Sequence, residues 1–199
     1  MSDASAPASG QSAQLRVPGA PSAWVIAHAT LIPNGAVLDL ASGLGRHARW
    51  LAERGHSVVA VDRDAEALAT MAGVPGIECR HCDLEGEHWA LSGERYAGIV
   101  VTNYLFRPRM AELAQMLAPG GVLIYETFMH GQQRFGRPHN PDFLLAPDEL
   151  KQWALAHGLE VLAFGQGDIS EPRAMCVQHL CARRPVVSVC DFPNREAMR

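Results

Sequence analysis

The chain has 199 residues, enough for one domain with a sizeable core, and its 17 basic and 21 acidic residues give a net charge of −4. This balance argues against a broad nucleic-acid footprint, which normally requires an excess of basic residues. No apolar run reaches the 18 residues of a candidate membrane span. The first residues lack the basic start and apolar core of a secretory signal, so we expect a cytoplasmic protein.

Residues 1–15 are small and polar, and we expect them to be disordered. One domain is expected over residues 16–184, followed by an unassigned tail over 185–199. The first helix should begin after Ser22, a favoured N-cap residue. Its apolar stripe is expected at helical spacing: Trp24, Ala27, His28 and Leu31.

The most informative stretch covers residues 36–62. The run from Ala36 to Leu40 is typical of a strand buried on both faces. A turn with two glycines follows, then a segment with helical spacing of apolar residues, then a second apolar run that ends at Asp62. This order is the first half of a nucleotide-binding βαβ unit.

The glycines and the acid have separate roles in such a unit. Gly43 and Gly45 allow a sharp turn and a close approach of a ligand to the main chain. The next helix directs its free amide groups at that ligand. Asp62 lies 19 positions after Gly43, close to the spacing at which a carboxylate binds ribose hydroxyls. The stretch therefore predicts a site for an adenosine-containing ligand.

Asp39 helps to choose between two such ligands. The pyrophosphate of a dinucleotide would meet the negative charge of this residue, whereas S-adenosylmethionine (SAM) carries an ammonium and a sulfonium group and no phosphate. Asp39 therefore favours SAM, although an acid bonded to turn amides is the alternative interpretation. Two other functions stay open, an NAD(P)-dependent oxidoreductase and a non-catalytic SAM-binding subunit.

Residues 37–47, with the sequence VLDLASGLGRH, resemble the first motif of the class I SAM-dependent methyltransferases. The resemblance extends over about residues 20–183 and is nearest to small bacterial members, including the tellurite-resistance type. Ser42 stands where many members carry cysteine or glycine. The resemblance implies SAM as cofactor and a helix near Ser22 that lies beside the cofactor or the substrate, while a helix that only covers the sheet is the alternative.

The remaining segments complete an α/β pattern. The expected helices cover residues 64–71, 110–117 and 148–157, and the expected strands cover 57–62, 77–81, 96–102, 122–127, 159–164 and 175–183. This order predicts a Rossmann-like, doubly wound, seven-stranded sheet that is mostly parallel and has an antiparallel last strand.

The resemblance implies a cofactor site at the carboxyl ends of the first strands. Asp62 would bind the ribose and Asp83 the adenine amine, with Leu84 against the ring. The predicted cofactor-binding residues are Asp39, Ala41, Ser42, Gly43, Gly45, Arg46, His47, Asp62, Arg63, Asp83, Leu84 and Asn103.

The acceptor site is expected around the long irregular segment 128–141, because long loops inside a domain are usually functional. Its two arginines suit a small polar or anionic acceptor, unless they merely pair with surface acids such as Asp142 or Asp148. The predicted substrate-binding residues are Tyr104, Phe128, Arg134 and Arg137. The candidate general bases are Tyr104, Glu126, His130 and His139.

Two further features carry negative predictions. Asn103 and Tyr104 partly resemble the Asn-Pro-Pro-Tyr signature of amino-group methyltransferases, but both prolines are missing, so we do not predict that activity. Cys79 and Cys82 form a C-x-x-C pattern without a second ligand pair, so we expect no metal and reduced thiols. The expected partner is a small-molecule acceptor, and the chain is expected to be a monomer or a homodimer.

Overall fold

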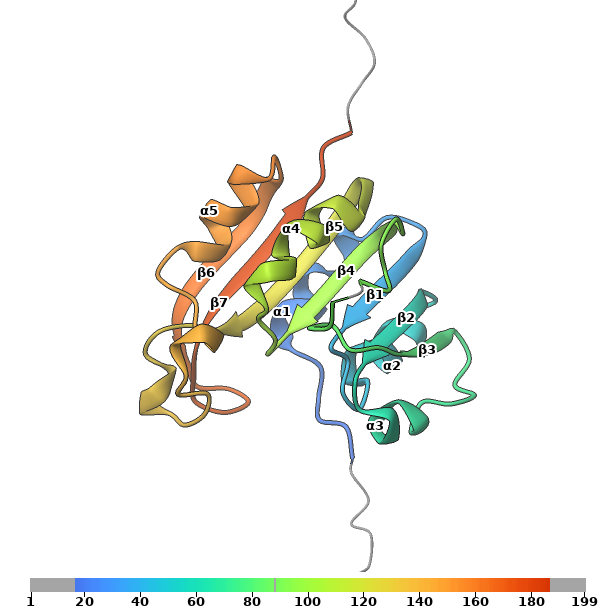
Figure 1. Cartoon of the computed structure of the whole chain (residues 1–199), viewed down its shortest axis with the longest axis horizontal. Coiled ribbons are helices and arrows are strands. Elements are labelled where there is room, and N and C mark those ends of the chain that lie inside the picture. The colour runs from blue at the N-terminus through green and yellow to red at the C-terminus, as the bar shows by residue number, and fades with distance from the viewer. Residues whose placement is uncertain (1–16, 88, 187–199) are drawn as a thin grey trace, which may run out of the picture.

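The elements of the structure follow the predicted alternation of strands and helices (Figure 1). The structure is a computed structural model and describes residues 17–87 and 89–186. The strands are β1 (Ala36–Leu40), β2 (Ser57–Asp62), β3 (Ile77–His81), β4 (Tyr96–Thr102), β5 (Leu117–Phe128), β6 (Glu160–Ile169) and β7 (Met175–Arg183). The α-helices are α1 (Ala23–His28), α2 (Arg46–Ala52), α3 (Ala65–Ala69), α4 (Met110–Met116) and α5 (Glu149–Ala156). The predicted disordered segment 1–15 and most of the tail 185–199 lie outside the described residues.

The seven strands form one sheet in the order β3-β2-β1-β4-β5-β7-β6, with β3 and β6 at its two ends (Figure 1). β1 to β5 pair in parallel, whereas β7 is antiparallel to both of its neighbours. The predicted fold class is therefore confirmed. The strand order reverses between β1 and β4, and sheets of this kind bind ligands outside the carboxyl ends of the strands at such a point.

Alternating side chains of the strands form two apolar cores, one on each face of the sheet. Leu38 and Ile99 belong to a core covered by α4 and α5. Val37 and Val100 belong to a second core that also contains residues of α1, α2 and α3. In Figure 1, α4 passes in front of the sheet and α1 lies behind it. Because side chains alternate along β1, Asp39 points to the same face as Val37, under α2.

The first helix buries a different face from the predicted one. Ser22 caps α1 as expected, because its Oγ accepts a hydrogen bond from the backbone amide of Trp24 at 3.1 Å. The predicted stripe was wrong by one position, and Leu31 is 39% exposed. The buried residues are Val25, Ala29 and Ile32. Both stripes have helical spacing, and contact with the sheet decides between them: Ile32 packs against the bare backbone of Gly98 in β4.

The C-terminal half contains longer strands than predicted. β5 begins at Leu117 because the expected turn 118–121 continues the ladder, with Gly120 N bonded to Arg184 O at 2.8 Å. β6 extends to Ile169, and it pairs with β7 from Glu160 to Ile169 with one irregularity between Val161 and Ala163. The irregular segment 128–141 contains a short 3-10 turn, Gln132–Arg134. These elements bring the loop between β6 and β7 to the same edge as the glycine turn.

Candidate functional site

The turn after β1 has the backbone geometry that its small residues allow. Ala41, Gly43 and Gly45 have φ values of +56°, +54° and +73°, a region that favours glycine. A Cβ at Gly45 would lie 1.8 Å from the sulfur of the buried Met71 side chain, which would have to move. A side chain at Gly43 would meet nothing within 4 Å. The turn therefore presents Gly43 to open space, and non-glycine strain of the kind seen at Ala41 is typical of functional sites.

Asp62 ties this turn to the end of β2. One carboxylate oxygen accepts a hydrogen bond from Gly43 N at 2.7 Å, and the other accepts one from Asp64 N at 2.9 Å. Each oxygen has a second lone pair, so the carboxylate can also accept bonds from a ligand. The structure thus places Asp62 where both the turn and a ribose could use it.

A small cleft lies between the ends of β1, β2 and β3. Its volume is about 140 Å³. We call it the Asp62 cleft, and it is lined by Ala41, Asp62, Arg63, Asp83, Leu84, Glu85 and Tyr104. Except for Glu85, all of these residues were predicted for the cofactor or the substrate. The structure therefore brings together the residues that the resemblance assigned to adenosine.

Asp39, in contrast, is held beneath α2. Only 1% of it is exposed, and its carboxylate accepts a hydrogen bond from Ala48 N at 2.9 Å. Burial raises the pKa of Asp39 to about 7, although the Ala48 bond and the charge of Arg46 oppose the rise. Asp39 does not line the Asp62 cleft, and its geometry is that of an acid bonded to a helix amide. Its contact with a cofactor stays a prediction.

Three neighbouring predicted residues have different surroundings. Burial lowers the pKa of His47 to about 3, so the ring is neutral, and its Nε2 accepts a bond from Ser22 N at 3.1 Å. Ser42 is buried and its hydroxyl has no hydrogen-bond partner among the described residues. Arg46 starts α2, and its guanidinium reaches Ala20 O at 3.3 Å. Arg46 lines the second cavity, described next. His47 connects the start of α1 to the start of α2 through its hydrogen bond with Ser22.

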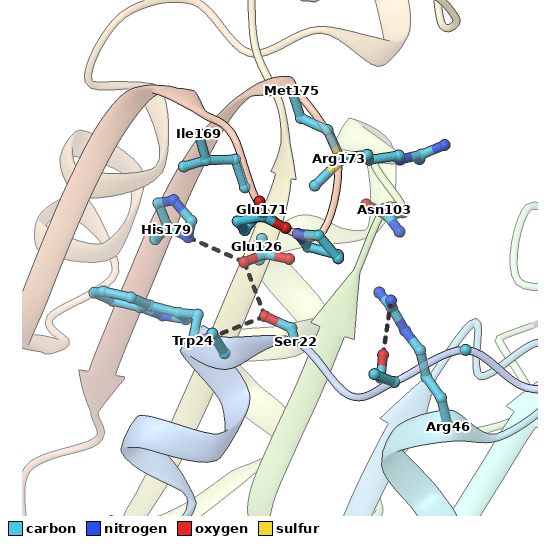
Figure 2. A pocket seen from close by; sticks show the side chains of 14 residues that line it. Ser22, Trp24, Arg46, Asn103, Glu126, Ile169, Glu171, Arg173, Met175 and His179 are labelled. Carbon is cyan, nitrogen blue, oxygen red and sulfur yellow. Dashed lines mark hydrogen bonds and ion pairs between the residues drawn. The ribbon is translucent and has the colours of Figure 1, made fainter.

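A second cavity, of about 520 Å³, lies between α1, β5 and the loop after β6. We call it the Glu126 cavity. Figure 2 shows Arg46, Asn103, Glu126 and His179 around it. Glu126 is 4% exposed and accepts hydrogen bonds from the Ser22 hydroxyl at 2.9 Å and from His179 Nδ1 at 3.1 Å. Burial alone would raise the pKa of Glu126, but these two bonds and the charge of Arg46 hold it below its usual value. The carboxylate is therefore ionised.

Sequence reasoning missed His179 and Arg173 as site residues. His179 lies directly opposite Glu126 in the antiparallel β5–β7 pair. The register of that pair is the signal that could have found it, but register depends on turn lengths that were not predicted. Arg173 lies in the β6–β7 loop, and nothing in its local sequence indicates a site.

A third cavity, of about 690 Å³, opens beside the end of β4. We call it the arginine cavity, and its lining includes Arg63, Glu85, Asn103, Tyr104, Phe128, Arg137, His139, Phe143 and Arg173. The ion pairs among the described residues do not include any of its three arginines. It shares Tyr104 with the Asp62 cleft and Asn103 with the Glu126 cavity, so the three adjoin along the carboxyl edge of the sheet.

Tyr104 and Asn103 join these cavities in different ways. Asn103 has a left-handed backbone, φ +55°, and its backbone N–H donates to the backbone carbonyl of Glu126 at 2.9 Å. The Tyr104 hydroxyl is buried without a hydrogen-bond partner among the described residues. Burial raises the pKa of Tyr104 well above its usual value. The tyrosine therefore stays protonated, which suits a hydrogen-bond donor and disfavours a general base.

Two predicted residues lie away from the three cavities. Arg134 pairs with Asp168 of β6 at 2.6 Å, and the side chains of both residues are largely exposed. The 3-10 turn that carries Arg134 directs it toward the β6–β7 hairpin, because its Nε also donates to Gly131 O at 3.1 Å. His130 is exposed, and its amide donates to Leu145 O at 2.9 Å. For Arg134 the alternative interpretation therefore holds: it pairs with a surface acid, which is Asp168. Arg137, in contrast, lines the arginine cavity.

The described residues contain no group of three or more histidine, cysteine or acidic side chains that could hold a metal ion. Cys79 Sγ donates to Leu68 O at 3.6 Å, and Cys82 Sγ donates to Asp83 O at the same distance. The prediction of no metal stays a prediction. In the part of the chain that the structure covers, none of the helices combines the length and apolar character needed to cross a membrane.

Comparisons with known proteins agree with this geometry. Residues 37–121 match the family model described as "Methyltransferase domain". Among solved structures, TehB from Haemophilus influenzae is 23% identical with a TM-score of 0.65, over 80% of this chain and 61% of TehB. A SAM-dependent methyltransferase from Methanosarcina mazei is 18% identical with a TM-score of 0.64, over 81% of this chain and 97% of that one.

The glycopeptide N-methyltransferase MtfA, in complex with S-adenosyl-L-homocysteine (SAH), is 20% identical with a TM-score of 0.60, over 81% of this chain and 88% of that one. At these identities the likeness shows a shared fold, and the chain spans less than two thirds of the TehB chain. A search among curated proteins finds no match to the sequence. The chain thus shares the fold of SAM-dependent methyltransferases, and its residues 37–121 match the model of a methyltransferase domain.

Proposed function

We propose that this chain is a SAM-dependent methyltransferase and that it transfers the methyl group of SAM to a small anionic acceptor bound in the arginine cavity. The observation that carries the proposal is the set of three arginines that line this cavity without ion pairs to described acids: Arg63, Arg137 and Arg173. Guanidinium groups bind carboxylate and phosphate oxygens with two parallel hydrogen bonds. The cavity volume of about 690 Å³ is in the usual range for small-molecule sites.

The residues at the carboxyl edge fit SAM. The hydroxyls of Ser42 and Tyr104 are buried and find no partner among the described residues, which is costly unless a ligand completes their hydrogen bonds. In the proposal, the adenosine lies in the Asp62 cleft between Asp62 and Asp83. The amino-acid end extends past Gly43 toward Arg46, whose guanidinium suits the carboxylate of that end. Bound SAM supplies an electrophilic methyl group on its sulfonium.

The arginine cavity adjoins this cofactor position. Tyr104, Arg63 and Glu85 line both the Asp62 cleft and the arginine cavity. Phe128 and Phe143 add aromatic walls, which can exclude water from the reacting centre. The protein holds acceptor and methyl group in line, and such positioning can lower a barrier by about 7–11 kcal/mol. A general base is needed only where the acceptor must lose a proton.

The experiment incubates the protein with SAM labelled on its methyl group and the small-molecule fraction of a bacterial extract. The labelled product should be retained on an anion-exchange column. Arg137→Ala should lower the rate of label transfer at limiting extract by at least tenfold while SAH affinity stays within twofold. Arg134→Ala is the matched control, because that arginine belongs to the same loop but pairs outside the cavities.

The control should behave as wild type, since an exposed ion pair contributes little to stability. Label that appears only in neutral or cationic small molecules, or only in added nucleic acid, would contradict the anionic acceptor. If Arg137→Ala and Arg134→Ala lower the rate of label transfer equally, the proposed role of Arg137 in acceptor binding is wrong.

A further inference from the structure

A hydrogen-bonded pair of titratable side chains lines the Glu126 cavity. Glu126 and His179 face each other across the β5–β7 pair, and both turn to the face covered by α1. The same Glu126 oxygen also accepts the Ser22 hydroxyl. Figure 2 shows these bonds converging on the carboxylate at the wall of the cavity. Both donors bind the same oxygen, Oε2, so one side of the carboxylate holds Ser22 and His179 in place.

The carboxylate decides which nitrogen of His179 carries the proton. Because Glu126 is ionised, it can only accept, so Nδ1 must be the donor in the 3.1 Å bond. Nε2 of a neutral ring then holds a free lone pair. Among the described residues, Nε2 makes no hydrogen bond, and it is not one of the buried unpartnered atoms. The ring lines the cavity, and its Nε2 is free to accept a hydrogen bond.

The surroundings of His179 hold the ring in place. The Trp24 ring lies 4.9 Å from it, between centroids, and Trp24 is itself fixed by a bond from its Nε1 to Leu180 O. Gly165, the partner of His179 in β6, lies beside the ring, and a Cβ there would be 3.7 Å from the ring's Cδ2. The charged groups that line the same cavity are Glu126 from β5, Arg46 from α2, and Glu171 and Arg173 from the β6–β7 loop. His28 of α1 lies on the other side of the stack, 4.0 Å from Trp24.

We infer that His179 is the general base of the methyl transfer and that Glu126 is its positioning residue. The inference rests on the proposed function. An acceptor X–H gives its proton to His179 Nε2 as the bond from X to the methyl carbon forms and the bond from that carbon to sulfur breaks. SAH leaves as a neutral thioether, and the imidazolium, stabilised by Glu126, later releases its proton to solvent.

The inference also narrows the acceptor. Asn103 and Arg173 line both the arginine cavity and the Glu126 cavity. An acceptor can therefore place an anionic group at the arginines while its nucleophile reaches His179. The fitting class is a small carboxylate or phosphate that also carries a hydroxyl, thiol or amine, a group that must lose a proton to accept a methyl.

The first test needs no acceptor. Imidazole ¹⁵N shifts are measured in the SAH complex of the full chain, and the His179 signals are assigned by their loss in His179→Gln. We expect His179 to carry its proton on Nδ1, and Glu126→Gln to abolish this preference. A ring protonated on Nε2 alone in the neutral form would overturn the inference, because that nitrogen could not accept a proton.

The second test follows label transfer from SAM into the small-molecule extract as a function of pH. His179→Gln should lower kcat at least 100-fold and remove the acidic limb of the pH profile, with SAH affinity within twofold of wild type. Glu126→Gln should lower kcat by a smaller factor and displace that limb. His157→Gln is the matched control, since His157 also stacks on a tryptophan but follows the end of α5, away from the three cavities.

The outcomes of the two proposals are separate. An unchanged pH profile in His179→Gln would overturn the general base even if the product is anionic. A product that is not anionic would overturn the proposed acceptor, while the ¹⁵N shifts and the pH profile would still decide the role of His179.

Discussion

Replacing Asp62 by alanine should weaken cofactor binding. In the free protein its carboxylate accepts two backbone amides, Gly43 N at 2.7 Å and Asp64 N at 2.9 Å. In the proposed complex it also accepts the ribose hydroxyls. Asp62→Ala removes the ribose contact and releases the turn that presents Gly43 to the ligand. The first loss acts only on the complex, whereas the second also lowers the stability of the free protein.

The expected size follows from the kind of bond that is lost. Hydrogen bonds to a charged group contribute about 1.5–3 kcal/mol. One such contribution lost from the complex corresponds to a rise in Kd of roughly 10- to 150-fold. Asp62 is partly exposed, which argues against values above this range.

The assay is calorimetric titration with SAH at a temperature below the unfolding transition of both proteins. Glu66→Ala provides the control, because it removes an exposed carboxylate of α3 close to the same edge. Its Kd should stay within twofold of wild type. If Asp62→Ala binds SAH as tightly as the wild type does, the ribose assignment is wrong.

Three other predictions concern stability and metal content. Because burial raises the pKa of Asp39 to about 7, the folded chain keeps a proton that the unfolded chain releases. The free energy of unfolding, measured with urea, should therefore be about 3 kcal/mol lower at pH 8 than at pH 5 because of this group. Asp39→Asn should remove that loss. Gly45→Ala should lower the free energy of unfolding, measured by thermal unfolding, by about 2–4 kcal/mol through backbone strain and a clash with Met71. Gly43→Ala should lower it by only about 1 kcal/mol, through strain alone. Equal losses in the two variants would contradict the clash at Gly45. Cys79→Ser with Cys82→Ser should leave SAH affinity unchanged, and elemental analysis that finds one metal ion per wild-type chain would contradict the prediction of no metal.

Local patterns were enough to predict the first half of the fold. The strand Ala36–Leu40, the glycine turn and the terminal acid are all encoded within residues 36–62, and the structure brings them to one edge. Parallel strands joined by helices leave few arrangements, so the Asp62 cleft followed from the order of elements. The buried stripe of α1 did not, because two stripes share helical spacing and only packing on Gly98 separates them.

The acceptor side was predicted less well, for a different physical reason. Arg134 and Arg137 look equivalent in sequence, but a single 3-10 turn directs one to Asp168 and the other to the arginine cavity. Arg173 and His179 reach the site through the β6–β7 hairpin, whose register is a long-range property of the sheet. A short-range pattern carries no information about such pairs.

The most direct test of the account is a crystal structure of the protein with SAH. We expect the adenosine between Asp62 and Asp83, the carboxylate of the amino-acid end near Arg46, and the sulfur facing the region where the arginine cavity meets the Glu126 cavity, with His179 Nε2 beyond it. A complex in which the sulfur points away from both cavities, or in which SAH covers Arg137 and Arg173 itself, would contradict the proposed acceptor site and the role of His179.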